Sequence, residues 1–402
     1  MVTILALFSC TKKRKAEPVA QRPASGAPQV PAELNEPEIR VAVRKMVSAA
    51  NFHAPAGLNV QSPDGGAGSW RLAPGGVTVQ ADAGGVSVNG RRLNGAVLTS
   101  LEPGRFLALD GQELAPKAVI YPSGGALTVI AYLPLESYLA GVLAGEVPYA
   151  RWHPEALKAQ AVASRSYALF QMKSRAREAY DVEADVMSQV FKSGQHHEPI
   201  LEQATSATRG LVVTYQGRLF PAYFHSTSGG HTEDVASVFP EQSSIAPLAG
   251  ARSPFSSISP VYTWTATLDK EALRGKLAAA PELNGQPVGA LRDLRFLTSA
   301  RSPRRAEVVE VIHANGSFQL PANRFRLIAG AGQLRSVWID RTIDRGSAFE
   351  FQGRGFGHGV GMCQYGSQGM AQQGYRFEQI LGLYYPGADM TKLYGGSSTA
   401  MK

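Results

Sequence analysis

The sequence lacks long hydrophobic runs and has almost no cysteine. Its longest apolar stretch, residues 118–133, is interrupted by Pro122 and by the pair Gly124-Gly125, whereas a membrane-spanning helix needs roughly 20 consecutive apolar residues. The two cysteines, Cys10 and Cys363, are too few for a disulfide framework. A hydrophobic core must therefore stabilise the protein, and 402 residues with 44% hydrophobic content are sufficient for one.

Nucleic-acid-binding motifs are absent as well. The formal net charge is +8, but four of the positive charges belong to residues 12–15, so the remainder is only mildly basic. The sequence contains no aromatic RNP motif, no zinc-finger spacing and no basic helical repeat. We therefore expect no nucleic-acid partner. The charge leaves two interpretations open, a mixed solvated surface or a preference for an anionic polymer.

The first ten residues have features of an export signal. Residues 2–8 are mostly apolar, and residues 7–10, Leu-Phe-Ser-Cys, resemble a bacterial lipobox, in which the cysteine accepts a diacylglycerol. The usual preceding positive charges are missing, so a trimmed secretory peptide or an accidental match are the alternatives. Lipidation at Cys10 or secretion would both place the protein in the extracytoplasmic envelope, with the lipid as its only membrane attachment. Residues 11–36, rich in Lys, Pro, Ala and Gln, are predicted to form a disordered tether.

The rest of the chain predicts an α+β fold in which β structure predominates. Residues 37–133 alternate apolar and polar positions between Gly-Gly and Asn-Gly pairs, which predicts a β-rich N-terminal region. Residues 134–392 are predicted to form a second domain, with an inserted lobe at about residues 265–293. Its helices are predicted at residues 135–143, 155–177, 200–208, 268–280 and 377–384. The alanine-rich helix 155–177 is expected to be central and buried, since small residues allow close approach.

Glu146 is the first candidate for chemistry. It lies in the break Gly145–Pro148 between two helical patterns, close to Tyr149, Trp152 and His153. A carboxyl group in such a junction loses hydration, which raises its pKa from about 4.3 and allows it to donate a proton. A departing glycosidic oxygen needs such a proton. The alternative is a helix-capping or surface charge.

Residues 225–233 form a loop with two histidines, His225 and His231, and with Glu233. These side chains are zinc ligands in other proteins, but their spacing fits no usual motif, and a third ligand would have to come from elsewhere. The hydroxyl groups and glycines of the loop equally suit a turn that hydrogen-bonds a sugar or a carboxylate. The sequence leaves both interpretations open.

Residues 353–366 contain alternating glycines, which bring backbone close to a ligand or to another strand. No register of this segment satisfies the nucleotide-binding pattern G-x-G-x-x-G. Cys363 near His358 suggests a thiol nucleophile, and the alternative is a free thiol packed in the core.

Several blocks in this order resemble the SpoIID/LytB family, which contains the stage II sporulation protein D and amidase-enhancer domains. The blocks are Leu133–Val142, Gly145–Pro148, Ala156–Tyr167, Ser188–Phe191, Ser226–Glu233, Gly353–Gly361, Gln364–Gly366, Gly369–Ala371, Ile380–Leu381 and Tyr384–Gly387. The resemblance covers roughly residues 115–390, with weaker likeness back to Ile39.

The resemblance implies a lytic transglycosylase that cuts peptidoglycan glycan strands, preferably strands without stem peptides, and that often stimulates a partner amidase. The family's catalytic acid is the glutamate of the Glu-x-Pro block, Glu146 here. It protonates the leaving oxygen and then accepts a proton from the C6 hydroxyl of the same muramyl sugar, which closes a 1,6-anhydro ring without a second carboxylate. The expected substrate-binding residues are Gln160, Arg165, Tyr167, Gln189, His225, Ser226, Ser228, His231, His358, Gln364 and Tyr365.

Two positions depart from the family pattern. Some members bind zinc through cysteine and histidine in the Ser-Gly-Gly loop, where this chain has Ser228, so we expect no metal cofactor. Cys363 replaces a serine that is usual in the family, which argues against a thiol mechanism. Gln160, Arg165 and Tyr167 either orient the acid or satisfy the helix core. The alternative functions are a non-catalytic peptidoglycan-binding protein that stimulates an amidase and, third, a metal-dependent hydrolase at the histidine loop.

Overall fold

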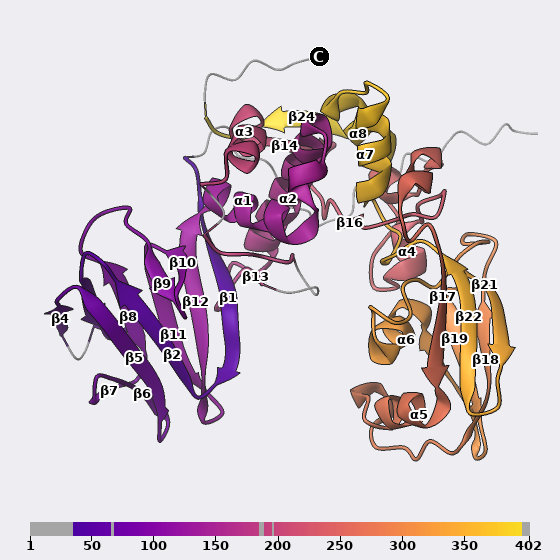
Figure 1. Cartoon of the computed structure of the whole chain (residues 1–402), viewed down its shortest axis with the longest axis horizontal. Coiled ribbons are helices and arrows are strands. Elements are labelled where there is room, and N and C mark those ends of the chain that lie inside the picture. Colours follow the sequence, from indigo (N-terminus) through magenta and orange to yellow (C-terminus); the bar gives the residue numbers. More distant parts are fainter. Residues whose placement is uncertain (1–34, 66–67, 185–188, 195–196, 396–402) are drawn as a thin grey trace, which may run out of the picture.

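The computed structural model describes residues 35–65, 68–184, 189–194 and 197–395. Within them, 24 strands and eight α-helices form a pair of sheets, a helical centre and a lobe of strands and helices (Figure 1). The predicted β-rich α+β class is confirmed. The predicted lipidation site Cys10 and nearly all of the predicted tether lie outside the described residues. No helix in the described part of the chain combines the length and the apolar character needed to cross a bilayer.

Two sheets pack face to face in the N-terminal part. The first contains, in spatial order, β13 (Val182–Glu183), β1 (Glu38–Val47), β12 (Ala126–Pro134), β11 (Lys117–Ser123), β8 (Ala96–Ser100), β3 (Leu58–Gln61) and β4 (Ser69–Leu72). The second contains β10 (Gln112–Ala115), β9 (Leu107–Leu109), β2 (Ala49–Ala54), β5 (Gly75–Asp82), β6 (Gly85–Val88) and β7 (Arg91–Leu93). Val41 of the first sheet and Val79 of the second are both fully buried in one core, because alternate residues of each strand face the other sheet.

The helical centre follows β12 directly. It contains α1 (Leu135–Glu146), α2 (Pro154–Ser174), α3 (Pro199–Ala207), α4 (Val235–Val238), α7 (Gln364–Gln372) and α8 (Phe377–Tyr384), with a sheet of β15 (Arg218–Leu219), β14 (Leu211–Tyr215) and β24 (Asp389–Lys392). α2 begins with Pro154, and the His153 imidazole accepts a hydrogen bond from the Glu155 amide at 3.2 Å. Its alanines let α1, α3, α7, α8 and β14 pack closely around it. α2 is the predicted central alanine-rich helix.

The lobe is larger than the predicted insertion of about residues 265–293. It contains the sheet β17 (Thr263–Asp269), β22 (Ala348–Arg354) and β21 (Ile339–Asp344), the sheet β18 (Leu291–Leu297), β19 (Val308–His313) and β20 (Gly316–Pro321), and the helices α5 (Lys270–Ala278) and α6 (Ala322–Ala329). Leu277, Phe325 and Phe351 are fully or almost fully buried in its own core. The lobe extends to residue 354 because β22 pairs with β17 along its whole length. The apolar and polar pattern of the sequence does not predict this pairing, because the two strands are remote in sequence.

The two ends of the lobe lie side by side, since the Gly355 amide donates a hydrogen bond to the Tyr262 carbonyl at 2.9 Å. The remaining short strands, β16 (Phe224–His225) and β23 (Met362–Cys363), pair in parallel. Figure 1 shows β16 between the helical centre and the lobe. Single 3₁₀ turns occupy Tyr149–Arg151, Ala246–Leu248, Pro254–Ile258 and Pro281–Leu283.

Candidate functional site

Glu146 is the last residue of α1. The helix ends here because Val147 is extended, with φ of −133° and ψ of 151°, and because the residue before a proline avoids helical backbone. The half-buried carboxylate is held by two donors. Its Oε1 accepts a hydrogen bond from the Val190 amide at 2.7 Å, and its Oε2 accepts a longer one from Gln364 Nε2 at 3.4 Å.

The electrostatic environment of Glu146 favours its protonated form. Burial raises the pKa of this carboxyl above its ordinary value, and the hydrogen bonds from Val190 and Gln364 offset only part of that effect. No cation among the described residues forms an ion pair with it. A carboxyl group of this kind can act as a general acid.

The two loops that the sequence singled out pair with each other beside Glu146. β16 and β23 bring His225 opposite Cys363, and Thr227 and Phe356 exchange backbone hydrogen bonds of 3.0 and 2.7 Å. Gly357 has a positive φ of 105°, and a Cβ there would lie 2.8 Å from the Cβ of His225. The glycine of this segment is therefore required for the close approach of the two loops.

A cavity of about 650 Å³ opens between the helical centre, the paired loops and the lobe. Its aromatic lining consists of Trp152, Tyr167, Tyr223, Phe224, Phe239, Phe356 and Tyr365. Trp152 and Tyr365 meet edge to face at 5.6 Å, and Tyr223 stacks on Phe239 at 4.9 Å. A concave, largely aromatic wall with a few polar groups is the usual form of a small-ligand site. Glu146, Glu241 and Arg326 are the charged residues in the lining.

The two histidines in the lining differ in their hydrogen bonding. His358 Nε2 donates to the Phe224 carbonyl at 2.9 Å, and its Nδ1 accepts from the Val360 amide at 3.1 Å. His225 Nδ1 donates to the Val360 carbonyl at 3.0 Å, whereas its buried Nε2 has no partner among the described residues. Burial lowers the pKa of His358 to about 3 and that of His225 well below its usual range. Both rings are therefore neutral near pH 7.

Comparisons with known proteins identify the relatives of this chain. A family model described as stage II sporulation protein matches residues 123–215. The chain is 34% identical over 276 residues to the stage II sporulation protein D of Bacillus amyloliquefaciens. The aligned region covers 65% of this chain and 75% of that protein. The chain belongs to the SpoIID/LytB family. Stage II sporulation protein D of Bacillus subtilis is similarly related, with 33% identity over 276 residues.

The family also contains a relative with a different name. The amidase enhancer of Bacillus subtilis is 28% identical over 297 residues, which cover 63% of this chain and 40% of that protein. Within the chain, the matched family segment includes Glu146, Val190 and Tyr167, whereas the paired loops and the lobe lie beyond it.

The cavity of this SpoIID/LytB protein contains many of the predicted site residues. Those that line it are Glu146, Tyr167, His225, Ser226, His358, Gln364 and Tyr365. Tyr167 accepts a hydrogen bond from Gln171 Nε2 at 2.8 Å, and the Ser226 carbonyl accepts one from the Tyr365 amide at 3.0 Å. The first contact lies within α2, and the second joins the start of α7 to the loop of residues 225–233.

Three other predicted residues lie in the core and do not line the cavity. Arg165 is fully buried and forms two hydrogen bonds with Glu136, of 2.9 and 2.7 Å. Gln160 donates to Ser164 at 3.0 Å, and Gln189 accepts from Tyr138 at 2.9 Å. Arg165 is thus placed to satisfy the helix core, whereas the buried Gln160 Oε1 has no hydrogen-bond partner among the described residues.

The remaining loop residues are also engaged within the protein. Ser228 is fully buried and bonds Ser256 at 3.0 Å, and His231 Nδ1 lies 2.5 Å from the Thr232 carbonyl. Cys363 is fully buried, accepts hydrogen bonds from the Ser228 and Gly366 amides at 3.2 Å, and has a pKa raised by burial. Such a thiol is a packed side chain rather than an activated nucleophile. The described residues include no group of three or more side chains placed to hold a metal ion.

Sequence reasoning missed the part of the cavity wall that the lobe supplies. Asn323, Arg326 and Leu327 of α6, together with Ala331 and Gly332, line the side that belongs to the lobe. No motif signals these residues, because α6 itself was not predicted. The exposed Glu241 and its neighbour Gln242 also line the cavity, and no motif signals them because they lie in an irregular loop.

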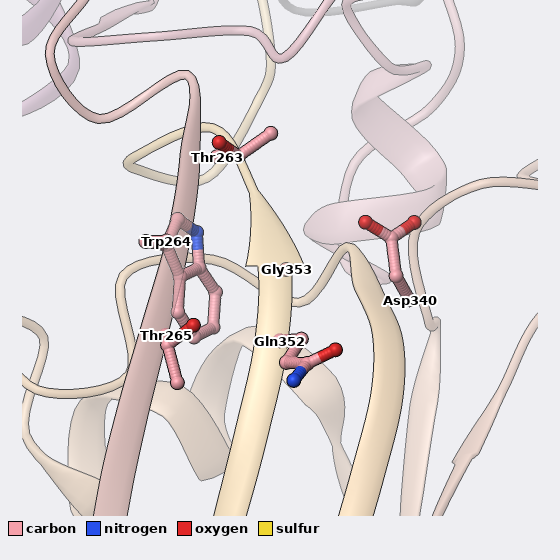
Figure 2. A pocket seen from close by; sticks show the side chains of 6 residues that line it. All are labelled: Thr263, Trp264, Thr265, Asp340, Gln352 and Gly353. Carbon is pink, nitrogen blue, oxygen red and sulfur yellow. The ribbon is translucent and has the colours of Figure 1, made fainter.

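A second depression, of about 410 Å³, lies over the lobe sheet (Figure 2). Its lining consists of Thr263, Trp264, Thr265, Asp340, Gln352 and Gly353. Asp340 is its only charged side chain, and its carboxylate accepts a hydrogen bond from Arg354 at 2.8 Å. Because this depression contains no acid free of an ion pair, the Glu146 cavity is the candidate active site of this SpoIID/LytB protein.

Proposed function

We propose that this protein is a lytic transglycosylase that cleaves peptidoglycan glycan strands, preferably strands without stem peptides, with Glu146 as the acid and base. One observation carries the proposal: a glutamate with a raised pKa and no ion pair with the described residues lies in the wall of a sugar-sized aromatic cavity. Membership of the SpoIID/LytB family supports a cell-wall substrate.

The proposed reaction needs a single carboxyl group. Protonated Glu146 donates its proton to the glycosidic oxygen as the bond between that oxygen and C1 of the muramyl sugar breaks. The resulting carboxylate accepts the proton of the C6 hydroxyl, whose oxygen bonds to C1 and closes the 1,6-anhydro ring. The acid is thereby regenerated and no water is consumed. The Val190 amide and Gln364 stabilise the transient carboxylate.

The deciding experiment digests purified denuded glycan strands and identifies the products by mass. We expect 1,6-anhydro-muramyl ends from the wild type and at least roughly a hundredfold less product from Glu146→Gln, since general acid catalysis contributes about 10²- to 10⁴-fold. Thermal unfolding of the variant checks that it is folded.

Glu241→Gln is the matched control, because Glu241 lines the same cavity and is exposed. A hydrolase needs two carboxylates and releases reducing ends. Retained activity with anhydro ends in Glu241→Gln agrees with the proposal, whereas reducing ends that depend on Glu241 would contradict it.

A second candidate function is peptidoglycan binding that stimulates a partner amidase. The name of the amidase enhancer relative favours it, and an aromatic cavity is equally suited to binding alone. If the wild type releases no anhydro ends but accelerates a cell-wall amidase, the binding function replaces the enzymatic one. Either function requires a location outside the cytoplasm, for which we propose attachment through a lipid on Cys10.

A further inference from the structure

Arg326 differs from the other buried arginines of the described chain. Arg165 pairs with Glu136, and Arg305 donates to the Ser228 and Gly357 carbonyls at 2.7 and 3.3 Å. Arg326 is also buried, with 6% of its surface exposed, but it forms no ion pair with any described residue. Its Nε donates to Asn323 Oδ1 on the same helix at 3.0 Å, which fixes the plane of the guanidinium. Its two terminal nitrogens have no hydrogen-bond partner within the described chain.

The guanidinium faces the cavity that contains Glu146. Arg326 belongs to the cavity lining together with Asn323, one helical turn earlier in α6. Burial, together with the neighbouring Arg305, lowers the pKa of Arg326 to about 10, so the group stays charged at neutral pH. A charge kept in a nearly buried position without a counter-ion destabilises the protein on its own. An anionic ligand group would remove that cost.

We propose that Arg326 binds the lactyl carboxylate of muramic acid and thereby selects glycan strands from which the stem peptide has been removed. This inference rests on the proposed function, since it names which feature of the glycan the cavity recognises. The two terminal nitrogens of a guanidinium match the two oxygens of a carboxylate in a planar fork. In a strand that carries stem peptides the same carbon belongs to a neutral amide, which cannot accept this pair of charge-assisted hydrogen bonds. The substrate must then come from a reaction that hydrolyses the amide between the lactyl group and the peptide.

The test compares two chemically matched ligands. One is denuded glycan with free lactyl carboxylates, and the other is the same strand with those carboxylates converted to methylamides. Binding is measured by calorimetry on the full chain carrying Glu146→Gln, so that the strands are not consumed. We expect the carboxylate strand to bind at least roughly tenfold more tightly, the range typical of hydrogen bonds to charged groups.

Three further variants in that background show whether Arg326 causes the preference. Arg326→Gln is expected to bind the carboxylate strand as weakly as the methylamide strand, with binding of the methylamide strand unchanged. Arg326→Lys is expected to retain part of the preference, since it keeps the charge but loses the fork. Arg324→Gln is the matched control, because Arg324 lies on the same helix outside the cavity lining and pairs with Glu282; it should keep the full preference.

Equal binding of both strands by the parent protein would overturn the inference. So would an equal loss for both strands in Arg326→Gln, which would indicate a structural role. These outcomes are separate from the test of catalysis. If the wild type makes no anhydro ends but the carboxylate preference depends on Arg326, the enzymatic proposal fails and this one stands. If the wild type and Arg326→Gln both cleave the two strands at equal rates, the enzymatic proposal stands and this inference fails.

Discussion

At the scale of single residues, the polar groups that line the cavity are of two kinds. Some are hydrogen-bonded within the protein, and others have no partner in the described protein and are available to a ligand. Both ring nitrogens of His358 are hydrogen-bonded to backbone, so this residue fixes the Phe224 and Val360 loops. His225 Nε2, by contrast, is a buried acceptor without a described partner, and the Arg326 terminal nitrogens are donors without one. Polar atoms of a cavity lining that have no partner in the described protein are available to a polar ligand.

The raised pKa of Glu146 gives a pH dependence with a definite sign. A general acid must hold its proton, so kcat/KM is expected to fall as pH rises through the raised pKa of Glu146. The Gln364 hydrogen bond lowers that pKa, so Gln364→Leu should raise it further and move the descending limb to higher pH. The measurement is the pH profile of anhydro-product release.

A suitable control for this profile is Gln372→Leu, an exposed position on the same helix, which should leave the limb in place. A limb that stays fixed or moves to lower pH in Gln364→Leu would show that a group other than Glu146 sets it. The histidines are not expected to contribute a limb near their ordinary value, because both have strongly lowered pKa values.

At the scale of elements, the acid depends on the contact between the end of α1 and the segment around Val190. Glycines at positions 141 and 145 allow this contact, since a Cβ at Gly145 would lie 2.3 Å from the Val190 carbonyl oxygen, and one at Gly141 would lie 2.4 Å from the Phe191 ring. The Val190 amide that bonds Glu146 is therefore positioned by two residues that carry no functional group themselves.

Gly145→Ala is expected to lower activity although alanine favours the helix. The added methyl group must displace the Val190 backbone and so misplace the donor to Glu146, and displacements of this size cost roughly a hundredfold in rate. Gly382→Ala in α8 is the matched control, since nothing lies within 4 Å of a Cβ there. It should raise the free energy of unfolding by about 0.5–1 kcal/mol and leave activity unchanged. Rates of product release and urea unfolding curves provide the comparison, and full activity in Gly145→Ala would show that the Val190 contact is dispensable.

At the scale of the whole molecule, the lobe is connected to the helical centre by buried polar groups. Arg305 of the lobe donates to the carbonyls of Ser228 and Gly357, one in each of the paired loops, and its Nε lies 3.9 Å from the Glu233 carboxylate. The cavity walls come from segments more than a hundred residues apart, such as those of Glu146 and Arg326. The lobe contributes both a structural arginine and the proposed carboxylate-binding one.

The proposed lipid attachment at Cys10, which lies outside the described residues, is tested at the scale of the cell. We expect a labelled lipid precursor to be incorporated into the wild-type protein and not into Cys10→Ala, with the variant released from the membrane fraction. Gel mobility and membrane fractionation measure both effects. Incorporation that persists in Cys10→Ala would exclude this residue as the attachment point.

The sequence by itself determined the α+β class, the central alanine-rich helix, the family and the identity of Glu146 as the candidate acid, because these depend on local patterns and on ordered motifs. Helix α8 begins and ends at the predicted residues, Phe377 and Tyr384, since its apolar spacing and the proline after it are local signals. The pairing of the loops at His225 and Cys363 was not visible in either loop alone.

Only the tertiary structure decided which polar residues face the cavity. Arg165 and Arg326 are both arginines on helices, and no local pattern distinguishes the one that pairs with Glu136 from the one without an ion partner in the described chain. That difference depends on which distant carboxylate the folded chain places within reach. The lobe wall was missed for the same physical reason: burial and charge pairing are set by contacts between residues remote in sequence.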